Sequence, residues 1–337
     1  MLGIDRHEVS LGNFEIKMLV LSGIAIQRDL LHMLRHDGID HLILMEIKII
    51  TIAMLFIAHE TEHTLLCQRR KEESELLVII AIAGIEQDFK ITPEQLEAAI
   101  TPKTKALILC SPSNPTGSVY SKEELQALAA VLAKYPNVYV IADEIYEHIN
   151  YIGKHESIAQ FEEIRDRVVI INGVSKAYAM TGWRIGWIAA PLWIAKACNK
   201  LQGQYTSGPC SVAQKAAEAA YTGSQQCIAD MREAFERRRN LVLDMLKDIP
   251  GLQVNEPKGA FYVFPKCSSF FGKTAPNGKV INDAADLAMY LLEEGHVACV
   301  GGGAFGSPEC IRMSYATSDE NLVKAFGRIK EALANLK

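Results

Sequence analysis

Apolar and polar residues alternate in blocks from about residue 90 to the C-terminus. Four short apolar runs, each bounded by turn-forming residues, have the length and composition of buried strands. These runs cover 105–110, 137–142, 168–171 and 185–189. The first of them leads into a Ser-Pro-Ser-Asn-Pro-Thr-Gly turn.

Helix-start signals lie between these runs. Thr92 and Gln95 form a capping box ahead of a helix that we expect to reach about residue 100. Ser121 and Glu124 form a second capping box, ahead of a helix to about residue 135. Strands that alternate with helices predict an α/β domain with a mostly parallel sheet, in which ligands bind at the carboxyl ends of the strands.

The pattern changes beyond residue 225. A long charged stretch predicts a helix, and two further helices and two short strands follow it. The helices are expected over 231–247, 282–294 and 319–336, and the strands near 297 and 311. This order predicts a smaller α+β domain at the C-terminal end of the chain.

Three segments follow from these patterns. Residues 1–88 form an N-terminal part that is rich in apolar residues, has few turn signals and allows no architecture to be assigned. Residues 89–225 form the large domain, and 226–337 form the small one.

Composition narrows the class of protein. The 337 residues are 49% hydrophobic and 22% charged, which is typical of a soluble globular protein, and a net charge of −5 provides no basic surface for nucleic acid. The most apolar stretch, 42–58, contains Glu46 and Lys48, so we expect buried core rather than a membrane span. The eight cysteines include no C-x-x-C pair, which is typical of reduced thiols in a cytoplasmic protein.

Polar side chains stand at the ends of the predicted strands. Asp143 follows one strand, with Tyr146 three residues later, and Lys176 follows the next. Asn114 follows the first strand, and Arg184 directly precedes the last. Each alone has an ordinary structural explanation, as a helix cap, a surface charge or a turn residue. Together they are expected to converge on one side of one sheet.

In the order and spacing of its motifs, the sequence from about residue 89 onward resembles the class I, fold-type-I pyridoxal-phosphate-dependent aminotransferases, among them bacterial aspartate aminotransferases. The matching stretches read SPSNPTG at 111–117, ADEIY at 142–146, SKAYAMTGWRIG at 175–186 and RMSYAT at 312–317. The resemblance implies a homodimer that moves an amino group between an amino acid and a 2-oxo acid. Aspartate and 2-oxoglutarate are the favoured pair.

The resemblance also implies roles for the strand-end residues. Lys176 would bind pyridoxal 5'-phosphate covalently through its amine and later shuttle the substrate proton. Asp143 would keep the pyridine nitrogen protonated, so that the ring becomes an electron sink. Tyr146 and Asn114 would hydrogen-bond the phenolate oxygen of the cofactor.

Two arginines would bind anionic groups. Arg184 would bind the cofactor phosphate, and Arg312, from the small domain, would bind the substrate α-carboxylate as a bidentate pair. The family often has a phosphate-binding Ser three residues before the lysine, where this chain has Gly173. Ser175 is the candidate to replace it.

The N-terminal part departs from the resemblance. The family's phosphate loop, the aromatic residue stacked on the cofactor and the Tyr donated across the dimer normally lie upstream, and none is recognisable between residues 1 and 87. We therefore expect the first quarter of the sequence to be truncated, altered or wrongly assigned relative to a functional enzyme. A chain that keeps the fold but holds the cofactor poorly is one alternative that follows, and another chemistry of the same fold, such as a C–S lyase, is a second.

One motif indicates a different class of enzyme. His59-Glu60-Thr-Glu-His63 satisfies H-E-x-x-H, whose two histidines share a helix face in zinc hydrolases while the first Glu acts as general base. Glu62 places a charge on a helix that is normally buried, and no third ligand stands out. A polar turn of an apolar helix is the simpler explanation, so no metal site is predicted.

Overall fold

The computed structural model describes residues 9–11, 14–16, 21–22 and 83–337. The expectations for residues 1–82, including the motif from His59 to His63, therefore lie outside the described residues. Three short N-terminal strands are described, and the sequence patterns had not predicted them. They are β1 (Val9–Leu11), β2 (Phe14–Ile16) and β3 (Leu21–Ser22), of which β1 and β2 pair antiparallel.

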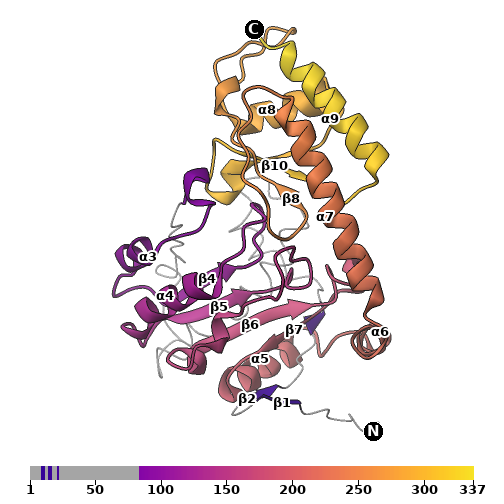
Figure 1. Cartoon of the computed structure of the whole chain (residues 1–337). Coiled ribbons are helices and arrows are strands. Elements are labelled where there is room, and N and C mark those ends of the chain that lie inside the picture. Colours follow the sequence, from indigo (N-terminus) through magenta and orange to yellow (C-terminus); the bar gives the residue numbers. More distant parts are fainter. Residues whose placement is uncertain (1–8, 12–13, 17–20, 23–82) are drawn as a thin grey trace.

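A five-stranded sheet in the order β3-β7-β6-β5-β4 lies in the lower half of Figure 1, above α5 (Leu192–Tyr205) and the β1-β2 pair. Its other strands are β4 (Ala106–Cys110), β5 (Tyr139–Asp143), β6 (Val168–Gly173) and β7 (Ile185–Ala189). The strands β4, β5 and β6 are parallel, while β7 and β3 run antiparallel to their neighbours. The four strands predicted between residues 105 and 189 are thus confirmed.

Helices around this sheet begin where the capping residues predict. Both capping boxes form, with the Thr92 and Ser121 hydroxyls accepting from the backbone N–H three residues on. They open α3 (Pro93–Ala99) and α4 (Lys122–Ala133), and the described helices continue with α5 (Leu192–Tyr205) and α6 (Ser211–Thr222). The last two were not predicted, and neither has a side-chain N-cap hydrogen bond that would mark its start.

A second group of elements lies beyond the sheet, and the long helix α7 (Gln226–Lys247) runs up to it in Figure 1. It contains a three-stranded antiparallel sheet in the order β8-β10-β9 and two more helices. These elements are β8 (Tyr262–Val263), α8 (Ala284–Glu293), β9 (Val300–Gly301), β10 (Ile311–Ser314) and α9 (Asp319–Ala334). Their core includes Phe235, Val242, Leu287, Ile311 and Phe326.

The strand expected near residue 297 begins later than predicted. The N–H of Val297 donates to the carbonyl oxygen of Leu291, which closes the end of α8 instead of joining the sheet. Pairing begins at Val300, opposite Arg312 of β10. Six 3₁₀ helices complete the described chain: Ile85–Gln87, Ile158–Gln160, Arg165–Arg167, Thr181–Trp183, Ser268–Phe270 and Gly302–Phe305.

Two glycines allow the two groups of elements to touch. The backbone N–H groups of Lys258 and Gly259 both donate to the carbonyl oxygen of Gly117, at 2.8 and 2.9 Å. A Cβ on Gly259 would lie 2.6 Å from the Cβ of Pro112, and a Cβ on Gly117 would lie 2.4 Å from that of Pro257. A side chain at either glycine would force these two segments apart.

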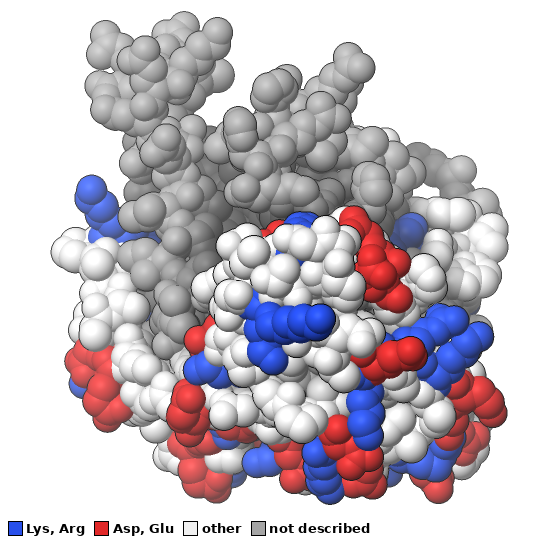
Figure 2. All heavy atoms as spheres, turned by 90° about the horizontal axis from the view of Figure 1, so that it is seen from above, with Lys and Arg blue, Asp and Glu red and all other residues white. Residues whose placement is uncertain are grey.

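Charge is mixed over the described surface. Lys and Arg are interspersed with Asp and Glu over the coloured part of the face in Figure 2. No helix among the described residues is long and apolar enough to cross a membrane.

Candidate functional site

The carboxyl ends of β4, β5 and β6 lie in register at one edge of the sheet. Cys110 pairs with Asp143, and Asp143 pairs with Ile171, so β5 ends on an acid between its two neighbours. Asp143 is 7% exposed, and its carboxylate accepts from the N–H of Ile145 at 3.3 Å. Lys176 follows β6 by three residues and is 8% exposed. The fold thus buries an acid and an amine at the same edge, where the sequence predicted them.

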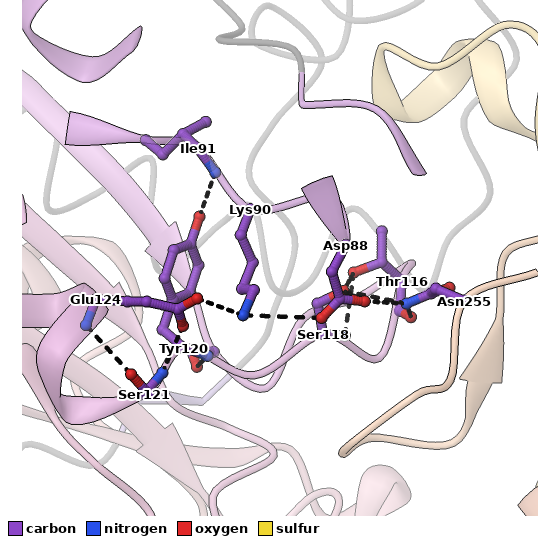
Figure 3. Close-up of polar contacts among 10 residues, drawn as sticks. Asp88, Lys90, Ile91, Thr116, Ser118, Tyr120, Ser121, Glu124 and Asn255 are labelled. Carbon is purple, nitrogen blue, oxygen red and sulfur yellow. Dashed lines mark hydrogen bonds and ion pairs between the residues drawn. The ribbon is translucent and has the colours of Figure 1, made fainter. Parts of the chain in front are cut away.

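The loop after β4 presents Asn114 and is held in place from the second group of elements (Figure 3). The side-chain amide of Asn255 donates to the Asp88 carboxylate at 2.7 Å. The same amide nitrogen donates to the Thr116 carbonyl oxygen and the Ser118 hydroxyl, each at 3.3 Å. Residue 255 therefore fixes the loop immediately after Asn114.

The same network fastens the other side of the loop (Figure 3). Lys90 forms an ion pair with Glu124 at 2.6 Å, and the Tyr120 hydroxyl accepts from the N–H of Ile91 at 2.8 Å. Burial raises the pKa of Tyr120 to about 12, so its hydroxyl stays neutral at physiological pH. These two contacts hold residues 90 and 91 against the segment that follows the loop.

Arg184 lies directly before β7, beside the end of β6. Its backbone has φ 58°, which lies in the left-handed region, and its side chain donates to the Thr181 carbonyl oxygen. Gly173 pairs with Gly186 across the two strands, and a Cβ at residue 173 would lie 2.8 Å from the Cα of Gly186. The serine that the family often has here would therefore not fit. Ser175 is half-buried, next to Lys176.

Arg312 comes from the second sheet and reaches Asn114. In β10 the buried Ile311 and Met313 face the core, and alternation places Arg312 on the opposite face. Its Nη1 donates to the Asn114 Oδ1 at 3.0 Å. The structure thus brings together two predicted residues that are far apart in the sequence.

Tyr146 links the two halves of the site, which are the residues at the edge of the first sheet and those of the second sheet. It is completely buried, and its ring lies 5.5 Å from the Lys176 Nζ. Its hydroxyl oxygen lies 2.9 Å from that of Tyr262 in β8. Among the described residues, Tyr146 therefore contacts both the buried amine and the second sheet.

Sequence reasoning missed two aromatic residues at this site. The Cζ of Arg312 lies 4.9 Å from the ring centroid of Tyr262 and 4.9 Å from that of Phe305. Tyr262 belongs to the Gly-Ala-Phe-Tyr-Val-Phe run at 259–264, which shows only that a buried strand is present. Its role depends on pairing with β10, which no local signal specifies.

A second buried acid lies behind the site. Glu144 follows Asp143 and forms an ion pair with the His155 Nε2 at 3.0 Å, while its other oxygen accepts from the Ser157 hydroxyl at 2.6 Å. Burial lowers the pKa of His155, but the hydrogen bond and the charge of Glu144 outweigh burial and raise it overall. The oxygens of Glu144 and Glu147 and a nitrogen of His155 lie within 4.8 Å of one another, and both Glu144 oxygens already have protein partners.

Comparison with known proteins identifies the family. The sequence profile described as aminotransferase class I and II matches residues 78–329. The chain belongs to this family. It is 50% identical over 256 residues to an aspartate/prephenate aminotransferase of Cereibacter sphaeroides, and 46% identical over 260 residues to an aspartate aminotransferase of Rhizobium meliloti.

Solved structures of the family share the fold. The crystal structure of the Rhizobium meliloti aspartate aminotransferase superposes with a TM-score of 0.73 at 44% identity, over 76% of this chain and 64% of that one. The fold-type-I α/β architecture expected from the sequence is therefore confirmed. The matched part is 75% of this chain and 64% of the Cereibacter protein, and 77% of this chain and 63% of the Rhizobium protein. The chain thus spans slightly less than two thirds of these relatives.

Proposed function

We propose that this chain is a pyridoxal-phosphate-dependent aminotransferase that takes its amino group from aspartate and passes it to 2-oxoglutarate. The observation that carries the proposal is the burial of Asp143 and Lys176 at the carboxyl ends of two neighbouring parallel strands, together with the bond from Arg312 of the second sheet to Asn114 after a third strand. Buried charged groups are costly unless they are paired or used in function. Relatives named as aspartate aminotransferases support the choice of donor.

The side chains at the sheet edge fit pyridoxal phosphate. The set provides an amine for covalent attachment, a buried carboxylate for a ring nitrogen, a phenol and an amide for an anionic oxygen, and a guanidinium for a phosphate. These groups belong to Lys176, Asp143, Tyr146, Asn114 and Arg184. When bound, pyridoxal phosphate supplies the electron sink for the substrate carbon.

Each of these side chains has a defined task in this proposal. Asp143 holds a proton on the ring nitrogen, and its burial strengthens that pairing. The Lys176 amine carries the cofactor and moves a proton at the substrate Cα. Tyr146 and Asn114 donate hydrogen bonds to the phenolate oxygen. Ser175 is proposed to assist Arg184 at the phosphate.

Arg312 binds and orients the substrate. Its planar guanidinium suits a bidentate pair with the α-carboxylate, and two flanking aromatic rings limit its rotation. Arg312 comes from the segment 226–337, which we propose is a small domain beside the large domain of 89–225. Substrate binding would then draw the two domains together and exclude water.

Borohydride reduction tests the proposal. The protein loaded with pyridoxal phosphate and then reduced should carry the adduct on Lys176 in peptide mass mapping. An adduct on another lysine, or none, would contradict it. A donor screen that found pyruvate and a thiol from a sulfur amino acid, without amino transfer, would indicate a C–S lyase instead.

We also propose a homodimer. The large-domain segment exposes Trp183, Tyr205 and Val212 at 46%, 68% and 67%, and burying such side chains against a second copy would remove apolar surface from water. Light scattering should return the mass of two chains, and the mass of one chain at working concentration would contradict the proposal.

A further inference from the structure

Tyr262 of β8 contacts both Tyr146, which follows β5 of the first sheet, and Arg312 of β10. It is 5% exposed in β8, opposite Ser314 of β10. The neighbouring pair, Val263 and Met313, is buried on the core face, so alternation places Tyr262 and Ser314 on the face that also carries Arg312. Tyr262 and Arg312 are thus diagonal neighbours, within reach for long side chains.

The hydroxyl of Tyr262 contacts the cofactor side of the proposed site. It lies 2.9 Å from the Tyr146 hydroxyl, and each phenol has one proton to donate. When Tyr262 donates, the Tyr146 proton is directed to a different acceptor, and Tyr146 becomes a stronger donor because hydrogen bonds in a chain polarise one another.

The ring of Tyr262 contacts the substrate side. The Arg312 Cζ lies 4.9 Å from its centroid and 4.9 Å from that of Phe305, so two rings flank the guanidinium. This contact fixes the plane of a side chain that otherwise has many rotamers.

We propose that Tyr262 is a positioning residue that serves both halves of the site, its hydroxyl setting the donor strength of Tyr146 and its ring setting the orientation of Arg312. The inference rests on the proposed function. Because the two contacts use different atoms, two substitutions separate them. Tyr262→Phe removes the hydroxyl and keeps the ring, and Tyr262→Leu removes both.

Two measurements other than turnover report on the two contacts. The first is the pH midpoint of the visible absorbance change of the protein loaded with pyridoxal phosphate. A weaker Tyr146 donor stabilises the phenolate less, so the midpoint should rise in both variants, by about 0.3–1 pH unit for one neutral hydrogen bond. The second is the Kd of maleate, a dicarboxylate that does not react. It is measured by calorimetry at one pH unit below the lowest midpoint found among wild type and the variants.

Maleate binding should separate the variants. Tyr262→Phe should bind maleate within about twofold of wild type, whereas Tyr262→Leu should bind it about 2- to 30-fold more weakly through loss of one cation–π contact. Phe305→Leu is the matched control, since Phe305 flanks Arg312 and lies outside the Tyr146 contact. It should weaken maleate binding and leave the midpoint unchanged.

Each result bears on one statement. An unmoved midpoint in Tyr262→Phe overturns the role of the hydroxyl, and wild-type maleate affinity in Tyr262→Leu overturns the role of the Tyr262 ring. If Tyr262→Leu does not fold, the midpoint of Tyr262→Phe still tests the proposal, which requires the hydroxyl as well as the ring. A wild-type protein that develops no visible band with pyridoxal phosphate contradicts the proposed function itself, and the inference with it. A yellow, active wild type with an unchanged Tyr262→Phe contradicts the inference alone.

Discussion

The two halves of the site are built by different rules of backbone geometry. Asp143 and Lys176 stand at the ends of parallel strands, where the chain leaves the sheet and side chains meet by topology alone. Arg312 and Tyr262 lie inside antiparallel strands and share a face only because β8 and β10 pair in one register. The ends of parallel strands place functional side chains close together whatever the details of the register. A strand face does so only in one register, since a slip of one residue would turn Arg312 toward the core.

Substitution at the sheet edge should have the largest effect on the rate of transamination. Lys176→Ala removes the group proposed to carry the cofactor and the proton, so transamination should fall by roughly 10³-fold. Stopped-flow half-reactions with aspartate measure the loss. Lys154→Ala, at an exposed lysine, is the control and should leave the rate unchanged. A Lys176→Ala rate within tenfold of wild type would show that another amine does this work.

Substitution on the strand face should have the next largest effect on the reaction. Arg312→Leu removes the charge-assisted bonds to the substrate carboxylate, and the loss of one such bond, worth about 1.5–3 kcal/mol, is enough to lower kcat/KM for aspartate roughly 10- to 150-fold. Arg312→Lys keeps the charge but loses the fork, and its kcat/KM should lie between those of Leu and wild type. Equal values for Leu and wild type would place the carboxylate elsewhere.

The junction between the halves should have a smaller effect on the reaction and a clear one on stability. Asn255→Leu removes the donations to Asp88, Thr116 and Ser118 and leaves their acceptors without this donor. The free energy of unfolding should fall by about 1–3 kcal/mol, measured by urea denaturation. Asn277→Leu, in an exposed turn, is the control. The prediction is wrong if the two variants have equal stability.

The pair behind the site should affect stability in a pH-dependent way and the reaction least. Because the folded-state pKa of His155 is raised above its usual value near 6.5, its charged pair with Glu144 stabilises the fold below about pH 6.5. This contribution is lost as the pH rises through the folded-state pKa. The stability difference between wild type and His155→Gln should therefore be largest near pH 6 and shrink at alkaline pH. A His155→Gln difference that grows with pH would reverse the sign assigned here.

The sequence predicted the elements that local signals specify and missed those that depend on tertiary contacts. Capping boxes at Thr92 and Ser121 and the apolar runs gave α3, α4 and the strands β4 to β7, since these signals are local. Helices α5 and α6 lack capping side chains and were missed. Strand β9 was placed too early because a hydrogen bond from Val297 to α8 competes with strand pairing.

By itself, the sequence determined the strands β4 to β7, the helices α3 and α4, the family and the residues at the strand ends, because hydrophobic period, capping and motif spacing are properties of neighbouring positions. Only the tertiary structure decided that Arg312 meets Asn114, that Tyr262 joins Tyr146 to Arg312 and that Asn255 holds the Asn114 loop. Those contacts depend on strand register and on the close approach at Gly117 and Gly259, where packing of the whole chain selects one arrangement.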